Sequence, residues 1–127
     1  MRTTTALSFL TLPLLARAAP LDLSERASCP PIHIFAARET TAPPGYGSTQ
    51  SVVNSILADH AGATSEAIVY PACGGGSACG GISYSQSVAQ GTAAVVTAVS
   101  NFAKTCPSAE IVLVGYSQVS AITVEGE

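Results

Sequence analysis

The sequence predicts an α/β domain, a three-layer sandwich in which a parallel sheet of about three strands is covered by two helices. Short runs rich in β-branched residues alternate along the chain with longer segments whose apolar residues recur at helical spacing. A strand, helix, strand, helix, strand order brings parallel strands together through right-handed crossovers. The length of 127 residues and the hydrophobic content of 47% fit a single globular domain.

The predicted strands are three short apolar runs. Residues 32–37 follow a pair of prolines, and residues 67–70 end at Pro71. Residues 111–114 contain only Ile, Val and Leu, which is the pattern of a strand buried on both faces.

Two longer segments between these strands are predicted to be helices, because their apolar residues form a stripe along one helical face. In residues 49–61, which Gly62 ends, the stripe consists of Val52, Val53, Ile56 and Leu57. In residues 85–104 the stripe consists of Val88, Val95, Val99 and Phe102.

The N-terminus predicts a secreted, extracellular protein. Residues 1–18 have the pattern of a signal peptide, because Arg2 precedes an apolar stretch and Ala16-Arg17-Ala18 offers small residues at a cleavage site. The apolar stretch is shorter than the ~20 residues of a membrane anchor, so no association with a membrane is expected. Residues 19–27 are predicted to be a short pro-segment.

Composition limits the partners and cofactors that we expect. The net charge is −3, with only 5 Lys and Arg residues, so a nucleic-acid partner is not expected. The 4 cysteines lack the short spacing of a zinc site and have no neighbouring histidine pair, so no metal or other cofactor is expected. We expect the folded protein to be a monomer.

An even number of cysteines in a secreted chain predicts two disulfides. The sequence allows three pairings. Cys73 and Cys79 flank a glycine-rich stretch that would close a small local ring. That pairing would leave Cys29 to bond Cys106.

The motif that could carry out catalysis is Gly115-Tyr116-Ser117-Gln118, which directly follows the third predicted strand. A serine in a tight strand-to-helix turn exposes its hydroxyl above the sheet, and this nucleophile elbow normally has the pattern G-x-S-x-G. Val119 stands at the second glycine, where a β-branched side chain would crowd the strand–helix contact. The alternative interpretation is a strand that ends in a polar turn without any chemistry.

From residue 28 to residue 118 the chain resembles the acetylxylan esterases of the cutinase-like serine esterase superfamily. The matching stretches are residues 29–35, 37–48, 70–75, 79–84 and 111–118. The Arg38-Glu39-Thr40-Thr41 loop and the segment from Cys79 to Tyr84 are more typical of acetylxylan esterases than of cutinases. The resemblance implies an α/β-hydrolase or cutinase-like fold, present here as an incomplete esterase domain.

The resemblance also implies roles for individual residues. Ser117 matches the family nucleophile, and the backbone N–H of Gln118 would be one donor of the oxyanion hole. Thr40 would supply the other donor through its N–H and its side chain. The family pattern suggests the same disulfides as the spacing does, Cys29–Cys106 and Cys73–Cys79, and it needs no metal or cofactor.

The chain departs from the family pattern at several positions. The family has glycine where this chain has Ala36 and Val119, and it has an Asp and then a His after the nucleophile. Residues 120–127 contain neither Asp nor His. Residues 119–127 are therefore predicted to be a tail outside the family domain, produced by intron read-through or a mispredicted gene end.

No other residue is expected to replace the missing base. His33 precedes the serine and is interpreted as a structural strand residue, and His60 lies near a helix end, where a cation is favourable. Arg38 and Glu39 could form an ion pair within their loop. Three tyrosines near the expected cleft could contact a sugar, although packing is their commoner role: Tyr46, Tyr84 and Tyr116.

The sequence thus predicts a carboxylic-ester hydrolase that deacetylates plant cell-wall xylan through an acyl-enzyme on Ser117, and that is inactive in this length. Its partner would be a polysaccharide or ester substrate. The alternatives are a cutinase-like esterase that acts on apolar esters, and a non-catalytic secreted relic or binding protein.

Overall fold

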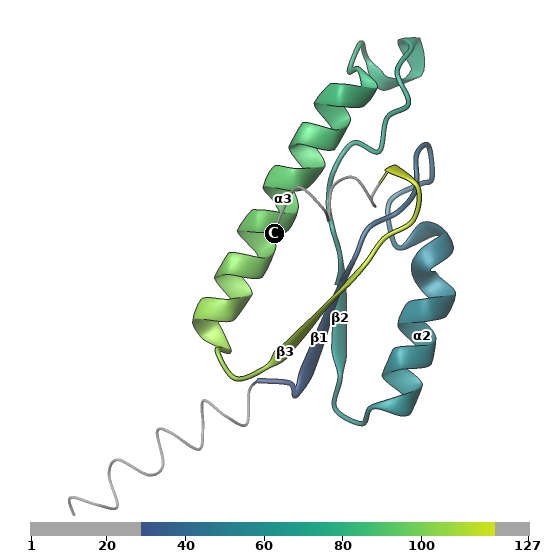
Figure 1. Ribbon diagram of the computed structural model, residues 1–127. Coiled ribbons are helices and arrows are strands. Elements are labelled where there is room, and N and C mark those ends of the chain that lie inside the picture. Colours follow the sequence, from purple (N-terminus) through teal and green to yellow (C-terminus); the bar gives the residue numbers. More distant parts are fainter. Residues whose placement is uncertain (1–28, 119–127) are drawn as a thin grey trace, which may run out of the picture.

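The computed structural model describes residues 29–118 as a sheet with one helix on each face (Figure 1). The elements in chain order are β1 (Ile32–Ala36), α2 (Gln50–Asp59), β2 (Thr64–Ala67), α3 (Tyr84–Thr105) and β3 (Glu110–Val114). This arrangement confirms the predicted α/β class and its three layers. The predicted signal peptide, pro-segment and tail lie outside the described residues.

The sheet is parallel, and its strand order is β2-β1-β3. β1 pairs with β2 from His33 opposite Thr64, and with β3 from Ile32 opposite Glu110. Both connections pass through a helix, as parallel strands require. The carboxyl ends of all three strands therefore meet at one edge of the sheet, and the loops that follow them leave from that edge.

β1 lies at the centre of the core and is buried on both faces. Because side chains alternate along a strand, Phe35 packs in the cluster beneath α3, and Ile34 and Ala36 pack in the cluster beneath α2. Val95 of α3 and Val53 of α2 are the buried helix residues of the two clusters.

Two predictions about the other strands were wrong. β3 is an edge strand of the described sheet and is only partly buried on its two faces, with Leu113 38% exposed, whereas β1 is the strand that is fully buried on both. β2 occupies Thr64–Ala67 rather than residues 67–70. Ile68 and Tyr70 are buried while Val69 is 87% exposed, so the apolar run that suggested a strand continues the inward–outward alternation after the ladder ends.

α3 begins at a capping box one residue before its predicted start. The Ser83 side chain accepts a hydrogen bond from the Gln86 backbone N–H at 3.1 Å, and the Gln86 side chain accepts one from the Ser83 N–H at 2.8 Å. These bonds satisfy donors that the first helical turn leaves free. The cap fixes the N-terminal end of α3 beside the glycine-rich loop.

The cysteines form two disulfides, Cys29–Cys106 and Cys73–Cys79. The first joins the segment before β1 to the residue that caps the end of α3, and the second closes the glycine-rich loop before α3. This is the connectivity that the spacing favours and that the family resemblance implies.

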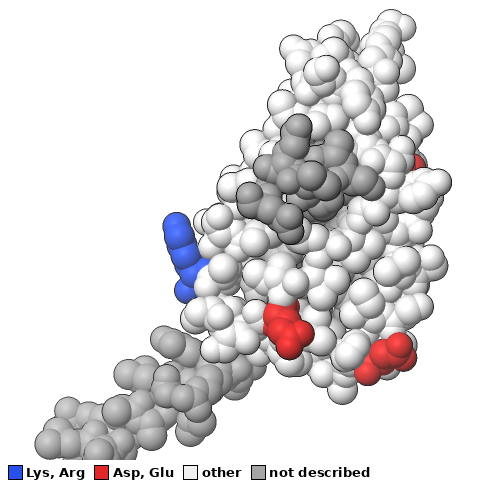
Figure 2. All heavy atoms as spheres, viewed as in Figure 1, with Lys and Arg blue, Asp and Glu red and all other residues white. Residues whose placement is uncertain are grey.

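The surface of the described residues carries few charges. On the face shown in Figure 2, acidic side chains stand apart from one another and basic side chains form no cluster. None of the described helices is both long enough and apolar enough to cross a membrane.

Candidate active site

Ser117 sits in a turn directly after β3 with a backbone φ of +63°. Left-handed backbone is uncommon for a residue with a side chain, and such strained residues cluster at functional sites. The Ser117 side chain is exposed, whereas Gln118, which has a helical conformation, is fully buried. A serine presented to solvent from a strained strand-to-helix turn is the geometry of a nucleophile elbow.

Thr40 lies on the loop that leaves the same edge of the sheet as Ser117. The Ala37 N–H donates to the Val114 carbonyl at 3.1 Å, so the chain beyond β1 begins beside the chain beyond β3. Thr40 follows Ala37 by three residues, and Ser117 follows Val114 by three. The fold therefore places both loops at one edge, and the oxyanion roles of Thr40 and Gln118 stay predictions.

Arg38 anchors the loop that carries Thr40. Its buried guanidinium donates to the backbone carbonyls of Ala42 at 2.8 Å, Tyr70 at 2.7 Å and Pro71 at 3.3 Å. The guanidinium also lies 5.3 Å from the centre of the Tyr70 ring, and the Tyr70 hydroxyl donates back to the Arg38 carbonyl. Burial raises the pKa of Tyr70, which keeps this hydroxyl protonated as a donor.

The same loop is fixed on its other side to the segment before the Cys73–Cys79 disulfide. The Thr41 N–H donates to the Ala72 carbonyl at 2.7 Å, and both residues have positive φ, +67° and +52°. A Cβ at Gly74 would lie 3.0 Å from the Thr40 side-chain methyl, which is closer than most Cβ contacts, so a larger residue there would have to displace Thr40 slightly. The conformation around Thr40 is therefore specified by contacts from several directions.

Glu39 does not form the ion pair with Arg38 that we considered from the sequence. Its carboxylate accepts hydrogen bonds from the Ser48 N–H at 2.8 Å and the Ser48 hydroxyl at 2.9 Å. Arg38 instead satisfies its donors with carbonyls, because its side chain turns into the core while Glu39 stays at the surface. The hydrogen bonds from Ser48 lower the pKa of Glu39.

This lowered pKa predicts an acid-sensitive contribution to stability. A carboxyl group whose pKa is lower in the folded state stabilises the fold above its ordinary value of 4.5, and loses that contribution as pH falls through the folded-state value. Between pH 4.5 and the lower folded-state pKa, we expect the urea unfolding free energy of Glu39→Gln to depend less on pH than that of the wild type does. Identical pH profiles for both proteins would contradict the assignment.

The Gln118 side chain closes a buried hydrogen-bond ring that the sequence did not reveal. Its Nε2 donates to the Cys73 carbonyl at 3.0 Å, and its Oε1 accepts from the Ser87 hydroxyl at 2.9 Å. Ser87 in turn accepts from the Cys73 N–H at 2.9 Å. A signal was present, since Ser87 shares the four-residue spacing of Gly91 and Val95 on the buried face of α3.

Neither described histidine is near the serine. His33 lies near the N-terminal end of β1, at the opposite edge of the parallel sheet from Ser117. Its Nδ1 lies 2.6 Å from the Thr64 hydroxyl, and its Nε2 lies 3.0 Å from a Glu66 carboxylate oxygen. Its ring stacks on Phe102 with centroids 4.4 Å apart. His60 is the exposed residue that caps the C-terminal end of α2. Both histidines are structural residues here.

The three tyrosines differ in their surroundings. Tyr46 packs against the cluster beneath α2, and its hydroxyl lies 2.7 Å from the Ser65 hydroxyl, so it is a packing residue. Tyr84 is 46% exposed at the start of α3, and Tyr116 is 63% exposed beside Ser117. Of the three, Tyr84 and Tyr116 have the most free surface to offer a substrate.

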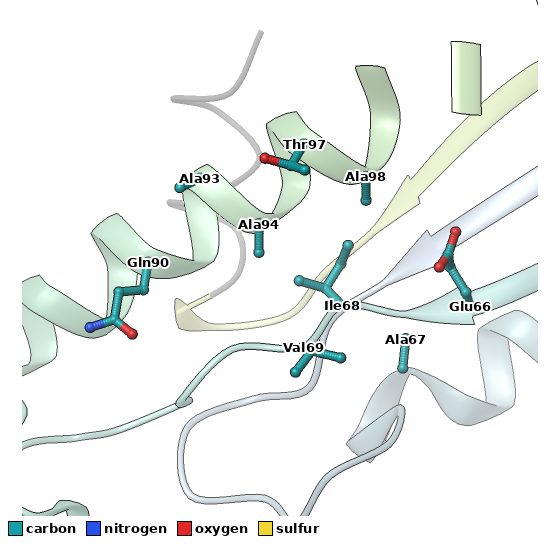
Figure 3. Close-up of a pocket in the computed structure, with 9 residues that line it drawn as sticks. All are labelled: Glu66, Ala67, Ile68, Val69, Gln90, Ala93, Ala94, Thr97 and Ala98. Atoms are coloured by element: carbon teal, nitrogen blue, oxygen red, sulfur yellow. The ribbon is translucent and has the colours of Figure 1, made fainter. Parts of the chain in front are cut away.

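The hollow shown in Figure 3 lies between β2 and α3, away from the serine. Its volume is about 440 Å³, and small apolar side chains such as Ala94 and Ala98 line it together with Glu66. None of Ser117, Gln118 and Thr40 contributes to its wall. Among residues 29–118 there is also no group of three or more His, Cys, Asp and Glu placed to hold a metal ion.

Comparison with known proteins identifies relatives of this architecture. The Cutinase family model matches residues 28–126, so the match extends past Gln118, where the resemblance in the sequence ended. Acetylxylan esterase 2 of Talaromyces purpureogenus is 64% identical over 81% of this chain and 44% of its own length. Cutinase 11 of Verticillium dahliae is 62% identical over 81% of this chain and 35% of its own length.

Solved structures show the same relationship. An iodinated acetyl xylan esterase superposes with a TM-score of 0.72 at 64% identity, covering 76% of this chain and 46% of that one. The catalytic core domain of acetyl xylan esterase from Trichoderma reesei also gives 0.72, at 57% identity over 76% of this chain and 47% of that one. The chain thus spans less than half the length of these relatives. With a parallel three-stranded sheet that matches theirs, it belongs to the cutinase family of α/β esterases.

Proposed function

We propose that this protein is a secreted carboxylic-ester hydrolase that removes acetyl groups from plant cell-wall xylan through an acyl-enzyme on Ser117. The observation that carries the proposal is the strained, exposed Ser117 directly after β3. The names of Acetylxylan esterase 2 and of the acetyl xylan esterase from Trichoderma reesei support an acetyl ester as the substrate. The pattern of residues 1–18 supports secretion.

The proposed reaction has two steps. The Ser117 hydroxyl oxygen attacks the ester carbonyl, the bond to the sugar oxygen breaks, and the sugar leaves with the serine proton. Water then attacks the acetyl-serine, which releases acetate and restores the hydroxyl. The backbone N–H of Gln118 and the N–H and hydroxyl of Thr40 would hold the negative oxygen in both steps.

We further propose that residues 1–127 alone hold the nucleophile and the oxyanion donors without a general base. His33 is engaged with Thr64 and Glu66 at the other end of the sheet, and His60 caps a helix. A serine without a base loses most of its reactivity, although oxyanion stabilisation alone retains roughly a 10³–10⁴-fold advantage over water in serine proteases. The 127-residue chain should therefore not turn over acetyl esters at a useful rate.

Imidazole supplied in solution tests both proposals. With 4-nitrophenyl acetate and imidazole, we expect mass spectrometry of acid-quenched samples to find one acetyl group on the peptide that contains Ser117, because imidazole accepts the serine proton during acylation. Without imidazole the acetyl group should be absent or scarce. Ser117→Ala is the control for direct reaction of imidazole with the ester, and Thr40→Val should reduce the adduct without changing the fold.

The possible results separate the hypotheses. No acetyl group on Ser117 at any imidazole concentration would favour the non-catalytic relic over the esterase. Rapid hydrolysis without imidazole, abolished by Ser117→Ala, would show that a base is present within the chain. The 62% identity to a cutinase keeps apolar esters as the second candidate substrate. Faster acylation by a long-chain ester than by the acetate would favour that candidate.

A further inference from the structure

We propose that the Ala72–Cys73 segment, closed by the Cys73–Cys79 disulfide, is a positioning element that sets the spacing between the two oxyanion donors. The inference rests on the proposed esterase function for its purpose, and on contacts of the described residues for its mechanism. The Ala72 carbonyl accepts from the Thr41 N–H at 2.7 Å, on the Thr40 loop. The next residue, Cys73, holds the side chain of Gln118.

The hydrogen-bond ring of Cys73, Ser87 and Gln118 is buried, so its members cannot exchange their partners for water and the position of Gln118 is fixed. Ser87 and Gln118 are both 0% exposed and Cys73 is 4% exposed. Each side-chain polar group of the ring has a partner at 2.9 to 3.0 Å, so the ring is satisfied within itself. Losing one member would leave the other buried polar groups without partners. An unpaired buried polar group costs more free energy than an ordinary hydrogen bond contributes.

The Gln118 side chain and its backbone N–H belong to the same residue, so anchoring one orients the other. Gln118 is the last described residue, and it has a helical conformation directly after the strained Ser117. Its predicted backbone donor would point out of the turn, while its amide side chain is fastened inward to Cys73 and Ser87. Ser87 is therefore a positioning residue that acts through Gln118.

The disulfide completes this element. Ala72 has a positive φ of +52°, and Gly75 and Gly76 also have positive φ, so the backbone around Cys73 has little regular secondary structure to hold it. The bond to Cys79 and the ring with Ser87 provide that constraint instead. Freeing Cys73 should loosen the Gln118 donor and the Thr41 contact together.

Backbone ¹⁵N relaxation of the whole chain measures this positioning without any need for catalysis. In the wild type we expect order parameters of about 0.85 at Thr41 and Gln118, the value for rigid backbone. Ser87→Ala should lower the value at Gln118 to below about 0.6, and the paired change Cys73→Ser with Cys79→Ser should lower both. Thr92→Val is the matched control, because the Thr92 hydroxyl bonds only the Val88 carbonyl of its own helix.

Gln118→Glu keeps the test decisive if Ser87→Ala fails to fold. A neutral carboxyl group has nearly the shape of the amide and can donate its O–H to the Cys73 carbonyl, whereas a carboxylate cannot. Order at residue 118 should therefore return at acidic pH in this variant, with wild-type protein at each pH as its control. A merely structural loss of packing would show no such recovery.

Coupling is reciprocal, so the ring should also protect the disulfide. We expect Gln118→Met to lower by about tenfold the dithiothreitol concentration that half-reduces Cys73–Cys79, as for the loss of one or two buried hydrogen bonds. The proposal would be overturned if the order parameter at Gln118 were unchanged in both Ser87→Ala and the double cysteine variant. It would also be overturned if Thr92→Val lowered that order parameter equally. If Ser117 were never acylated but the variants still changed the order parameters and the disulfide reduction as expected, the esterase function would be wrong and the coupling would be supported.

Discussion

Replacing Arg38 with methionine should lower the free energy of unfolding by roughly 3–5 kcal/mol, among the largest losses available to a single substitution in this chain. The guanidinium donates to three backbone carbonyls, of which that of Tyr70 is buried. Methionine fills a similar volume but donates no hydrogen bond, so these carbonyls would lose their partners. Urea unfolding monitored by circular dichroism gives the loss as a shift in midpoint at constant slope.

The opposing effect is the desolvation of the guanidinium itself. A buried charge costs free energy to remove from water, and apolar replacements of buried ion pairs can be neutral or stabilising. Here, however, the partners are backbone carbonyls, which a substitution cannot remove with the charge. The unpaired carbonyls of Tyr70 and Pro71 should therefore dominate the result.

Arg38→Lys is the matched variant, because it keeps the charge and loses the planar fork that reaches separate carbonyls. We expect its stability to fall between that of the wild type and that of Arg38→Met. A methionine variant within about 1 kcal/mol of the wild type would show that the carbonyls find other donors. If Arg38→Lys were as unstable as Arg38→Met, geometry rather than charge would be the essential feature of this residue.

Removing the Cys29–Cys106 disulfide by two serine substitutions should cost about 4 kcal/mol in the chain-entropy account of cross-links. The bond joins residues 77 apart in the sequence, so the unfolded chain gains much freedom when it is absent. A domain of this kind has a total stability of only about 5–15 kcal/mol. The loss should therefore bring the chain close to unfolding at physiological temperature, as thermal denaturation would measure.

The second disulfide is the natural comparison, because it closes a loop with a separation of only 6. The same account gives about 2 kcal/mol for its removal. If the Cys73–Cys79 variant proved the less stable of the two, contacts in the native state would outweigh unfolded-chain entropy. That outcome would agree with the buried ring of Cys73, Ser87 and Gln118 and would contradict the entropy ranking.

Local patterns in the sequence were sufficient for the class of fold and for the position of the candidate nucleophile. β1 and β3 were located to within one residue at each end, because Pro31 and Gly115 bound continuous apolar runs. α3 was located as closely, since its apolar stripe has a helical period. Ser117 could be placed after a strand because the glycine before it is a local turn signal.

The tertiary structure decided which hydrogen bonds those elements make and which residues they bring to Ser117. β2 was misplaced because only its ladder with β1 shows where pairing stops, and Ile68 and Tyr70 are buried beneath α3 beyond that point. Gln118 meets Cys73 and Ser87 across sequence separations of 45 and 31. Such partners are polar residues without periodicity, so no local pattern predicts that they meet. Only the crossing of α3 over the parallel sheet brings the glycine-rich loop and the serine turn together.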